Sequence, residues 1–189
     1  MASLDTAVAP IGTDRLLLRP LRASDAEPLF ALFADWEVIR QLNMPPWPYA
    51  LKDADAFIRQ QLGQDLTRIT FAITFEDALV GGIDVRMNPA DHSQRGPGPK
   101  LGYWLAQPYW GCGYMTEAAR GLLAHVFDAG LGDVVYSGAF ADNAASLRVQ
   151  EKLGFVHDGE SMLYARPRDG RFPHINTVLT RARFESGRP

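Results

Sequence analysis

The sequence predicts an α/β fold, a sandwich of helices against a mixed β-sheet, in a chain of 189 residues. Patterns typical of strands and of helices alternate along the chain. A long apolar stripe of helical period follows Gly111 and Gly113, and two apolar runs flank Glu76 and Asp77 as in a hairpin. These observations predict the element order β-α-α-β-β-β-α-β-α-β-β.

The first third of the chain is expected to form one strand and two helices. The run Arg-Leu-Leu-Leu-Arg at 15–19 predicts a strand, and Ser24 with Glu27 predicts a capping box that begins a helix. The prolines of 43–49 exclude regular structure there. A second helix is expected to bury Ala54, Phe57, Ile58 and Leu62.

The rest of the chain predicts most of the sheet and two more helices. Strands are expected at 70–75, 79–87, 100–105, 134–139, 155–164 and 174–180. The helix after Gly113 should bury Met115, Ala118, Ala119, Leu122, Leu123, Val126 and Phe127, which recur at helical spacing. A last helix should begin at Asn143, stop at Gly154 and bury Ala145, Val149 and Leu153.

One domain is expected over residues 13–183, with flexible ends at 1–12 and 184–189 and a Gly/Pro loop at 91–99. Hydrophobic residues make up 47% and charged residues 22%, which is ordinary for a globular protein. The net charge of −3 argues against a nucleic-acid partner. No apolar run is long enough to cross a membrane, and no signal peptide is evident, so a cytoplasmic location is expected. Cys112 is the only cysteine and the four histidines are scattered, so no metal site is expected.

The glycine pair is the strongest local sign of a ligand. Gly111 and Gly113 permit a tight turn, and the helix behind them offers free N–H groups to a phosphate. A plain structural turn explains the pair equally well. A dinucleotide fingerprint fits poorly, because Thr116 stands where a third glycine is needed, and no Gly-Lys-Ser/Thr follows as in a P-loop.

Three stretches carry a family resemblance: Gly-Tyr-Trp-Leu at 102–105, Tyr-Trp-Gly-x-Gly-Tyr-x-Thr-Glu-Ala at 109–118, and Asn-x-x-Ser-x-Arg-Val-x-Glu-Lys-Leu-Gly-Phe at 143–155. Together they resemble the Gcn5-related N-acetyltransferase (GNAT) superfamily, and within it the RimJ/RimL-like group. The resemblance covers roughly residues 13–180. It implies a sheet with splayed central strands, which hold acetyl-CoA, and transfer of its acetyl group to a primary amine by direct attack in a ternary complex. The acceptor would be a protein or peptide N-terminus or a small-molecule amine.

The resemblance also implies roles for individual residues. Ser146 would lie near the sulfur and give the departing thiolate a proton, and Asn143 would bond the cofactor arm. The backbone of Trp104 and Leu105 would pair with the pantetheine. The N–H groups of the loop would hold the pyrophosphate, from Trp110, Gly111, Cys112, Gly113, Tyr114 and Met115.

Three positions depart from the family pattern. Pro108 replaces a common Arg or Gln before the glycines, and Gln150 replaces a tyrosine acid. Lys100 stands where relatives often carry an acidic residue, so Asp84 on the preceding strand becomes the candidate base. A solvated strand residue is the simpler interpretation of Asp84, and the remaining candidates are Tyr103, His92 and a water chain. Because that carboxylate is missing, a catalytically weak acyl-CoA sensor is the alternative function.

The acceptor side is expected near the aromatic, proline-rich segment between the first two helices. Trp36, Trp47 and Tyr49 would shape an acceptor pocket there, or would cover the edge of the core. Cys112 is expected to be a spacer and no nucleophile. Homodimers are frequent in the group, so a homodimer is a further expectation, although the sequence shows no interface signature.

Overall fold

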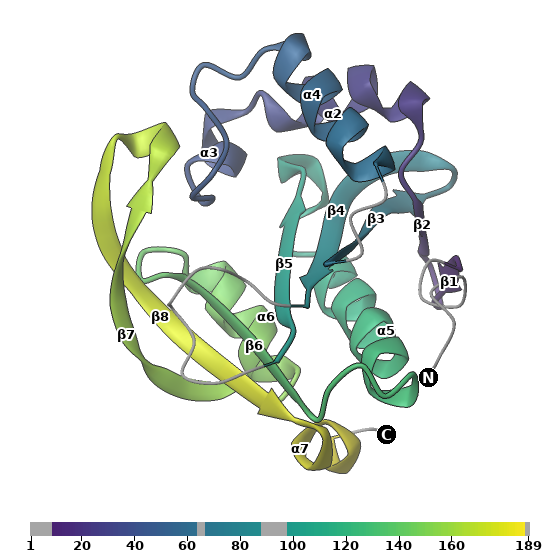
Figure 1. Cartoon of the computed structure of the whole chain (residues 1–189), viewed down its shortest axis with the longest axis vertical. Helices are drawn as coiled ribbons and strands as arrows, with labels where there is room; N and C mark the ends of the chain where they lie inside the picture. Colours follow the sequence, from purple (N-terminus) through teal and green to yellow (C-terminus); the bar gives the residue numbers. More distant parts are fainter. Residues whose placement is uncertain (1–8, 64–66, 88–97, 188–189) are drawn as a thin grey trace.

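The computed structural model describes residues 9–63, 67–87 and 98–187, and in them eight strands form a single mixed sheet (Figure 1). The order across the sheet is β1-β2-β3-β4-β5-β6-β8-β7. Neighbouring strands are antiparallel except β5 and β6, which run parallel. The strands are β1 (Ile11–Gly12), β2 (Leu17–Pro20), β3 (Arg68–Phe75), β4 (Ala78–Arg86), β5 (Lys100–Leu105), β6 (Val134–Phe140), β7 (Val156–Ala165) and β8 (Gly170–Thr180). The predicted α/β class with a mixed sheet is confirmed.

Helices cover both faces of the sheet (Figure 1). They are α2 (Ala26–Phe33), α3 (Trp36–Ile39), α4 (Leu51–Leu62), α5 (Tyr114–Asp128), α6 (Ala144–Lys152) and α7 (Arg181–Ser186), with short 3-10 turns η1 (Ala23–Asp25), η2 (Gln107–Tyr109) and η3 (Arg166–Arg168). One apolar core lies between the sheet and α5, and a smaller one lies under α2, α3 and α4 on the other face. Among the described residues, no helix has the length and apolar character needed to span a bilayer.

The helix α5 confirms the predicted stripe in full. All seven apolar residues are buried, with exposed fractions between 0% and 7%. Gly113 caps the start of the helix at a φ of 80°, and Gly130, at 66°, turns the chain after its end. Both φ values lie in the left-handed region, where glycine is unstrained, so this residue type fixes both ends of α5.

The predicted hairpin is also confirmed, as β3 and β4. Its turn residues, Glu76 and Asp77, adopt φ values of 48° and 64°. Two consecutive positive values match the two-residue turns whose twist suits a hairpin.

The central strands diverge, as the family resemblance implies. β5 and β6 share one paired position, Lys100 with Tyr136, and separate toward their carboxyl ends (Figure 1). Next to that pair, Tyr136 N–H donates to the Pro99 carbonyl over 2.8 Å, and Ser137 Oγ donates to the Leu101 carbonyl over 3.2 Å. The sheet is therefore joined at one end of β5 and open at the other.

Two expectations about the chain ends need correction. Ile11 and Gly12 pair with Leu18 and Leu17 as a short strand, where a flexible end was expected. At the other end, α7 buries Phe184 against Phe127, with ring centroids 5.2 Å apart. We propose one domain whose bounds extend from 13–183 to 11–186, because a single sheet connects them.

The expected capping box at Ser24 is wrong. The side chain of Asp25 accepts the Arg22 N–H over 2.7 Å, and its carboxylate pairs with Arg19 over 2.7 and 2.8 Å. A buried carboxylate with a bidentate guanidinium partner is a stronger anchor than a serine hydroxyl. The expected loop at 91–99 falls mostly outside the described residues.

The expected buried face of α6 is only partly correct. Leu153 is buried, but Ala145 is exposed and Val149 is half-buried. Gln150 is the most buried residue of the helix, with 1% exposed. Helical spacing located α6 correctly. It did not predict which residues are buried, because one side of the helix, with Ser146 and Val149, lines a cavity and does not pack in the core.

Candidate functional site

The open gap between β5 and β6 holds a cavity of about 560 Å³ that reaches both faces of the sheet. On the α5 and α6 side it is lined by residues that include Gly111, Gly113, Tyr114, Met115, Thr116, Asn143, Ser146 and Val149. On the opposite side the lining includes Val38, Gln41, Leu42, Asn43, Arg86 and Lys100. Two ligands that enter from opposite faces can therefore meet between the strands.

The glycine loop forms one end of the cavity. Gly111 has a φ of 76°, and a Cβ there would meet no atom within 4 Å. The Trp110 indole N–H donates to the Leu105 carbonyl over 2.7 Å, which ties the loop to β5. The N–H groups at the start of α5 follow directly, where the helix dipole favours an anion. Open space, glycine backbone and a helix start together fit a pyrophosphate.

Five of the six expected phosphate-loop residues line the cavity, and Cys112 is the exception. Cys112 is exposed, and its thiol lies 3.5 Å from the Trp110 carbonyl. In the described part of the chain, no cluster of three His, Cys, Asp or Glu side chains is arranged to bind a metal ion.

The free edge of β5 supplies backbone groups to the cavity. Ala106 N–H donates to Val80 of the β4 segment over 2.9 Å, and alternate residues of an antiparallel strand face the same neighbour. The backbone of Trp104 therefore faces β4, whereas that of Tyr103 and Leu105 faces the gap. Trp104 does line the cavity, and its ring packs on Phe33 with centroids 4.8 Å apart. The pairing of its backbone with the pantetheine stays a prediction, which this orientation does not favour.

Asn143 and Ser146 both line the cavity, at the first turn of α6. The Asn143 side-chain oxygen accepts the Ser146 N–H over 3.1 Å, so it caps the helix as the simpler interpretation predicts. Because the oxygen is used by the cap, the amide –NH₂ of Asn143 is the group that can donate to a ligand. The structural and the functional interpretation of this residue are therefore compatible.

Ser146 belongs to a polar network that joins three elements. Its hydroxyl lies 2.9 Å from the Tyr103 hydroxyl of β5. The Gln150 –NH₂ donates to both hydroxyls, over 3.3 Å to Ser146 and 3.2 Å to Tyr103. Thr177 of β8 donates to the Gln150 oxygen over 2.6 Å. Thr177 thus fixes the orientation of the amide, which can only donate toward Ser146 and Tyr103.

Two tyrosines, Tyr103 in the cavity lining and Tyr49 in the core under α2, have raised pKa values. Burial raises the pKa of Tyr103, although hydrogen bonds with Ser146 and Gln150 lower it in part. Burial, together with the nearby Asp53 carboxylate, raises the pKa of Tyr49 to about 12. Because its pKa is raised, Tyr103 keeps its proton at neutral pH. It is therefore suited to hydrogen bonding and not to deprotonating an amine.

Asp84 is neither solvated nor in the lining of the large cavity. It has 8% of its surface exposed, and its Oδ2 lies 2.9 Å from Arg68 Nε and 3.4 Å from Arg86 Nε. The two guanidinium groups, from β3 and β4, occupy the carboxylate. The role of Asp84 as the base stays a prediction, and its surroundings do not favour it. His92, the other side chain considered, lies outside the described residues.

The three expected acceptor-site aromatics lie outside the lining of the cavity. Trp36 and Trp47 have 37% and 42% of their surfaces exposed, with ring centroids 5.1 Å apart. Tyr49 packs on Phe33 in the core under α2, with centroids 4.9 Å apart.

The same segment does reach the cavity, through residues that the sequence analysis missed. They are Val38, Gln41, Leu42 and Asn43. No local spacing marks these residues, because the cavity forms only when β5 and β6 diverge. Thr177 was missed for the same reason, since β8 joins the site through sheet order and not through proximity in sequence.

Comparisons with known proteins agree with this architecture. Residues 15–156 match the family model described as an acetyltransferase (GNAT) domain. The chain is 31% identical over 156 residues to the uncharacterized N-acetyltransferase YoaA of Bacillus subtilis (strain 168), covering 78% of this chain and 82% of YoaA.

Solved structures show the same fold. RimJ of Mycobacterium smegmatis, in complex with CoA-disulfide, superposes with a TM-score of 0.77 at 19% identity, covering 94% of this chain and 90% of RimJ. RimL, a ribosomal L7/L12 alpha-N-protein acetyltransferase in complex with coenzyme A, superposes with a TM-score of 0.77 at 17% identity. The match covers 91% of this chain and 98% of RimL. The family match, which spans most of the chain, carries the assignment. The chain belongs to the GNAT acetyltransferase family and is an acetyl-CoA-dependent N-acetyltransferase.

Proposed function

We propose that the enzyme acetylates a primary amine that enters the cavity from the side of α3. The observation that carries this proposal is that the cavity passes between β5 and β6. The glycine loop lies on one face, and Val38, Leu42 and Asn43 lie on the other. A donor on the α5 and α6 side and an acceptor on the α3 side would meet without a covalent enzyme intermediate.

Acetyl-CoA supplies an activated acyl carbon and a thiolate leaving group. The chain's own residues hold and polarise it. Backbone N–H groups from Trp110 to Met115, Cys112 excepted, are proposed to bind the pyrophosphate, and the Asn143 –NH₂ to bind the arm. The N–H groups of Tyr103 and Leu105 face the gap and are proposed to stabilise charge that develops on the carbonyl oxygen.

Ser146 is proposed to protonate the thiolate. Its oxygen accepts a hydrogen bond from the Gln150 –NH₂ over 3.3 Å and lies 2.9 Å from the Tyr103 hydroxyl. We propose that Tyr103 donates in this pair, which leaves the Ser146 hydrogen for the thiolate. A hydroxyl held in this orientation is ready to donate when negative charge appears on sulfur. The network thereby compensates for the tyrosine acid that Gln150 replaces.

Thr177→Val tests the network without altering the cavity lining. Valine has a similar shape but cannot donate to the Gln150 oxygen, so the amide loses the partner that orients it. We expect kcat to fall about tenfold, in line with the loss of one hydrogen bond of ~1.4 kcal/mol, with no change in the Kd of acetyl-CoA. Thr177→Ser keeps the donor and is the matched control. Equal kcat values for the two variants would exclude the network from catalysis.

Two classes of amine are candidate acceptors. RimL is named for a protein N-terminus, and this relationship makes a peptide N-terminus one acceptor to test. Small amines form the other class. Trp36 and Trp47 are exposed near the segment that lines the cavity, and we propose that they contact the part of the acceptor outside the cavity.

The first experiment measures thermal unfolding with acetyl-CoA, using NADH and ATP as controls. A selective ligand at 100 times its Kd stabilises the native state by ~2.7 kcal/mol. Free-thiol release is then measured with a panel of peptides, polyamines, amino acids and amino sugars. Selective stabilisation followed by amine-dependent thiol release supports the proposal. Stabilisation without thiol release for any amine would instead support an acyl-CoA sensor. A cytoplasmic location and a homodimer stay predictions.

A further inference from the structure

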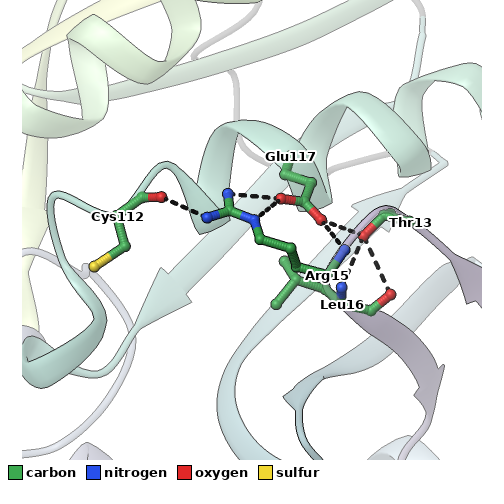
Figure 2. Close-up of polar contacts among 5 residues, drawn as sticks. All are labelled: Thr13, Arg15, Leu16, Cys112 and Glu117. Carbon is green, nitrogen blue, oxygen red and sulfur yellow. Dashed lines mark hydrogen bonds and ion pairs between the residues drawn. The ribbon is translucent and has the colours of Figure 1, made fainter.

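Arg15 connects the N-terminal segment to the glycine loop (Figure 2). Its Nη1 donates to the Cys112 carbonyl over 3.1 Å. Its Nε and Nη2 both lie 2.7 Å from Oε2 of Glu117, in the first turn of α5. Its guanidinium carbon also lies 4.5 Å from the centroid of the Tyr114 ring, which lines the cavity. One side chain thus contacts the loop and the helix that follows it.

Glu117 is the anchor of this cluster. Its Oε1 accepts the Thr13 hydroxyl and the Arg15 backbone N–H, each over 2.7 Å. Burial raises the pKa of Glu117, but the hydrogen bonds from Thr13 and Arg15 outweigh that effect, so its pKa lies below the ordinary value. The carboxylate is therefore charged at neutral pH and holds the guanidinium in a fixed place. Arg15 in turn balances a negative charge that would otherwise lie close to an anion site.

The contact with Cys112 determines where the next N–H points. In a trans peptide the C=O and the N–H point in opposite directions. Because the Cys112 carbonyl is directed at Arg15, the Gly113 N–H is directed away from it. Gly113 lines the cavity and Cys112 does not, which agrees with this orientation. Gly113 has a φ of 80°, and the contact from Arg15 holds the peptide plane that precedes it.

We propose that Arg15 is a positioning residue of the cofactor site, which fixes the Cys112–Gly113 peptide so that its N–H faces the pyrophosphate. The inference rests on the proposed phosphate-binding role of the loop. It also explains how the loop functions with Pro108 at a position where relatives often carry Arg or Gln. Here the guanidinium comes from the segment just before β2 and acts through the backbone.

The test compares three ligands on Arg15→Ala and Arg15→Lys. Calorimetry gives the Kd of CoA and of dephospho-CoA, which lacks the 3′-phosphate, and competition against CoA gives that of pantetheine, which lacks the pyrophosphate. We expect Arg15→Ala to weaken CoA and dephospho-CoA equally, by about tenfold, and to leave pantetheine unchanged. Arg15→Lys keeps the charge but cannot reproduce the forked contacts, so a similar loss is expected. Arg59→Ala, an exposed arginine on α4, is the control and should match the wild type.

Each other result overturns the inference. If Arg15→Ala weakened the binding of CoA but not of dephospho-CoA, Arg15 would be a direct ligand of the 3′-phosphate. Weaker binding of all three ligands would show a general disturbance of the fold. Full affinity in Arg15→Lys would reduce the role to charge, and Arg15→Lys also decides the question if Arg15→Ala does not fold. Wild-type enzyme that binds CoA no better than pantetheine would instead refute the phosphate role of the loop itself, and the inference with it.

Discussion

Ser146→Ala should lower kcat by about 10²–10⁴-fold, the range typical for loss of a general acid, and leave the Kd of acetyl-CoA unchanged. The Ser146 hydroxyl lines the cavity and is part of the network with Tyr103 and Gln150, and the proposed role as acid depends on it. Steady-state kinetics give kcat, and calorimetry gives the Kd.

The control is Ser161→Ala on β7, whose hydroxyl contacts Asn176 and does not line the cavity. That variant should keep the wild-type kcat. A pH profile adds a second measurement, because loss of an acid should remove the limb of the profile that depends on proton donation. Normal turnover in Ser146→Ala would remove this residue from the mechanism.

Gly113→Val should abolish measurable CoA binding. Valine is strained at a φ of 80°, and its Cβ would lie 3.6 Å from Arg15 Nη2, so its methyl groups would displace the guanidinium. The loop then loses several charge-assisted hydrogen bonds to phosphate, each worth roughly 10–100-fold in affinity. Calorimetry with CoA measures the effect.

Gly130→Val separates backbone strain from the loss of the site. Gly130 has a similar φ of 66°, a Cβ there would meet no atom within 4 Å, and it is not part of the cavity lining. Both variants should lose comparable stability, of order 1–2 kcal/mol, but only Gly113→Val should lose CoA. A folded Gly113→Val enzyme with wild-type affinity would contradict the phosphate site.

Local pattern predicted the elements that depend on one segment alone. The stripe of α5 was correct at every position, because helical period and burial coincide in a helix that lies flat on the core. The Ser24 capping box was wrong, because the pattern does not reveal that Asp25 has Arg19 as a buried partner. The contact of Asp25 with Arg19 on β2 is a tertiary interaction, which local spacing does not show.

The lining of the cavity was predictable at the glycine loop and at the first turn of α6, and less so elsewhere. The glycine loop and the first turn of α6 are contiguous motifs, so the family resemblance named Gly111, Gly113, Asn143 and Ser146, and all four line the cavity. Thr177, Arg15 and the lining residues of α3 come from segments brought together by the sheet. Their contribution depends on strand order and on the divergence of two strands, which no spacing in the sequence records.

Because β5 and β6 share a single paired position, the two halves of the sheet would rotate relative to each other about Lys100 and Tyr136, as about a hinge. From that hinge β5 extends five residues to Leu105, a lever arm of roughly 16 Å at ~3.3 Å per residue. A rotation of about 5° at the hinge moves the far end by roughly 1.4 Å, close to the length of one carbon–carbon bond. The helix α5 contacts β5 on one side of the gap and also contacts α6, which packs on β6 on the other side. A small change in this helix packing would therefore have its largest effect at the open end of the gap.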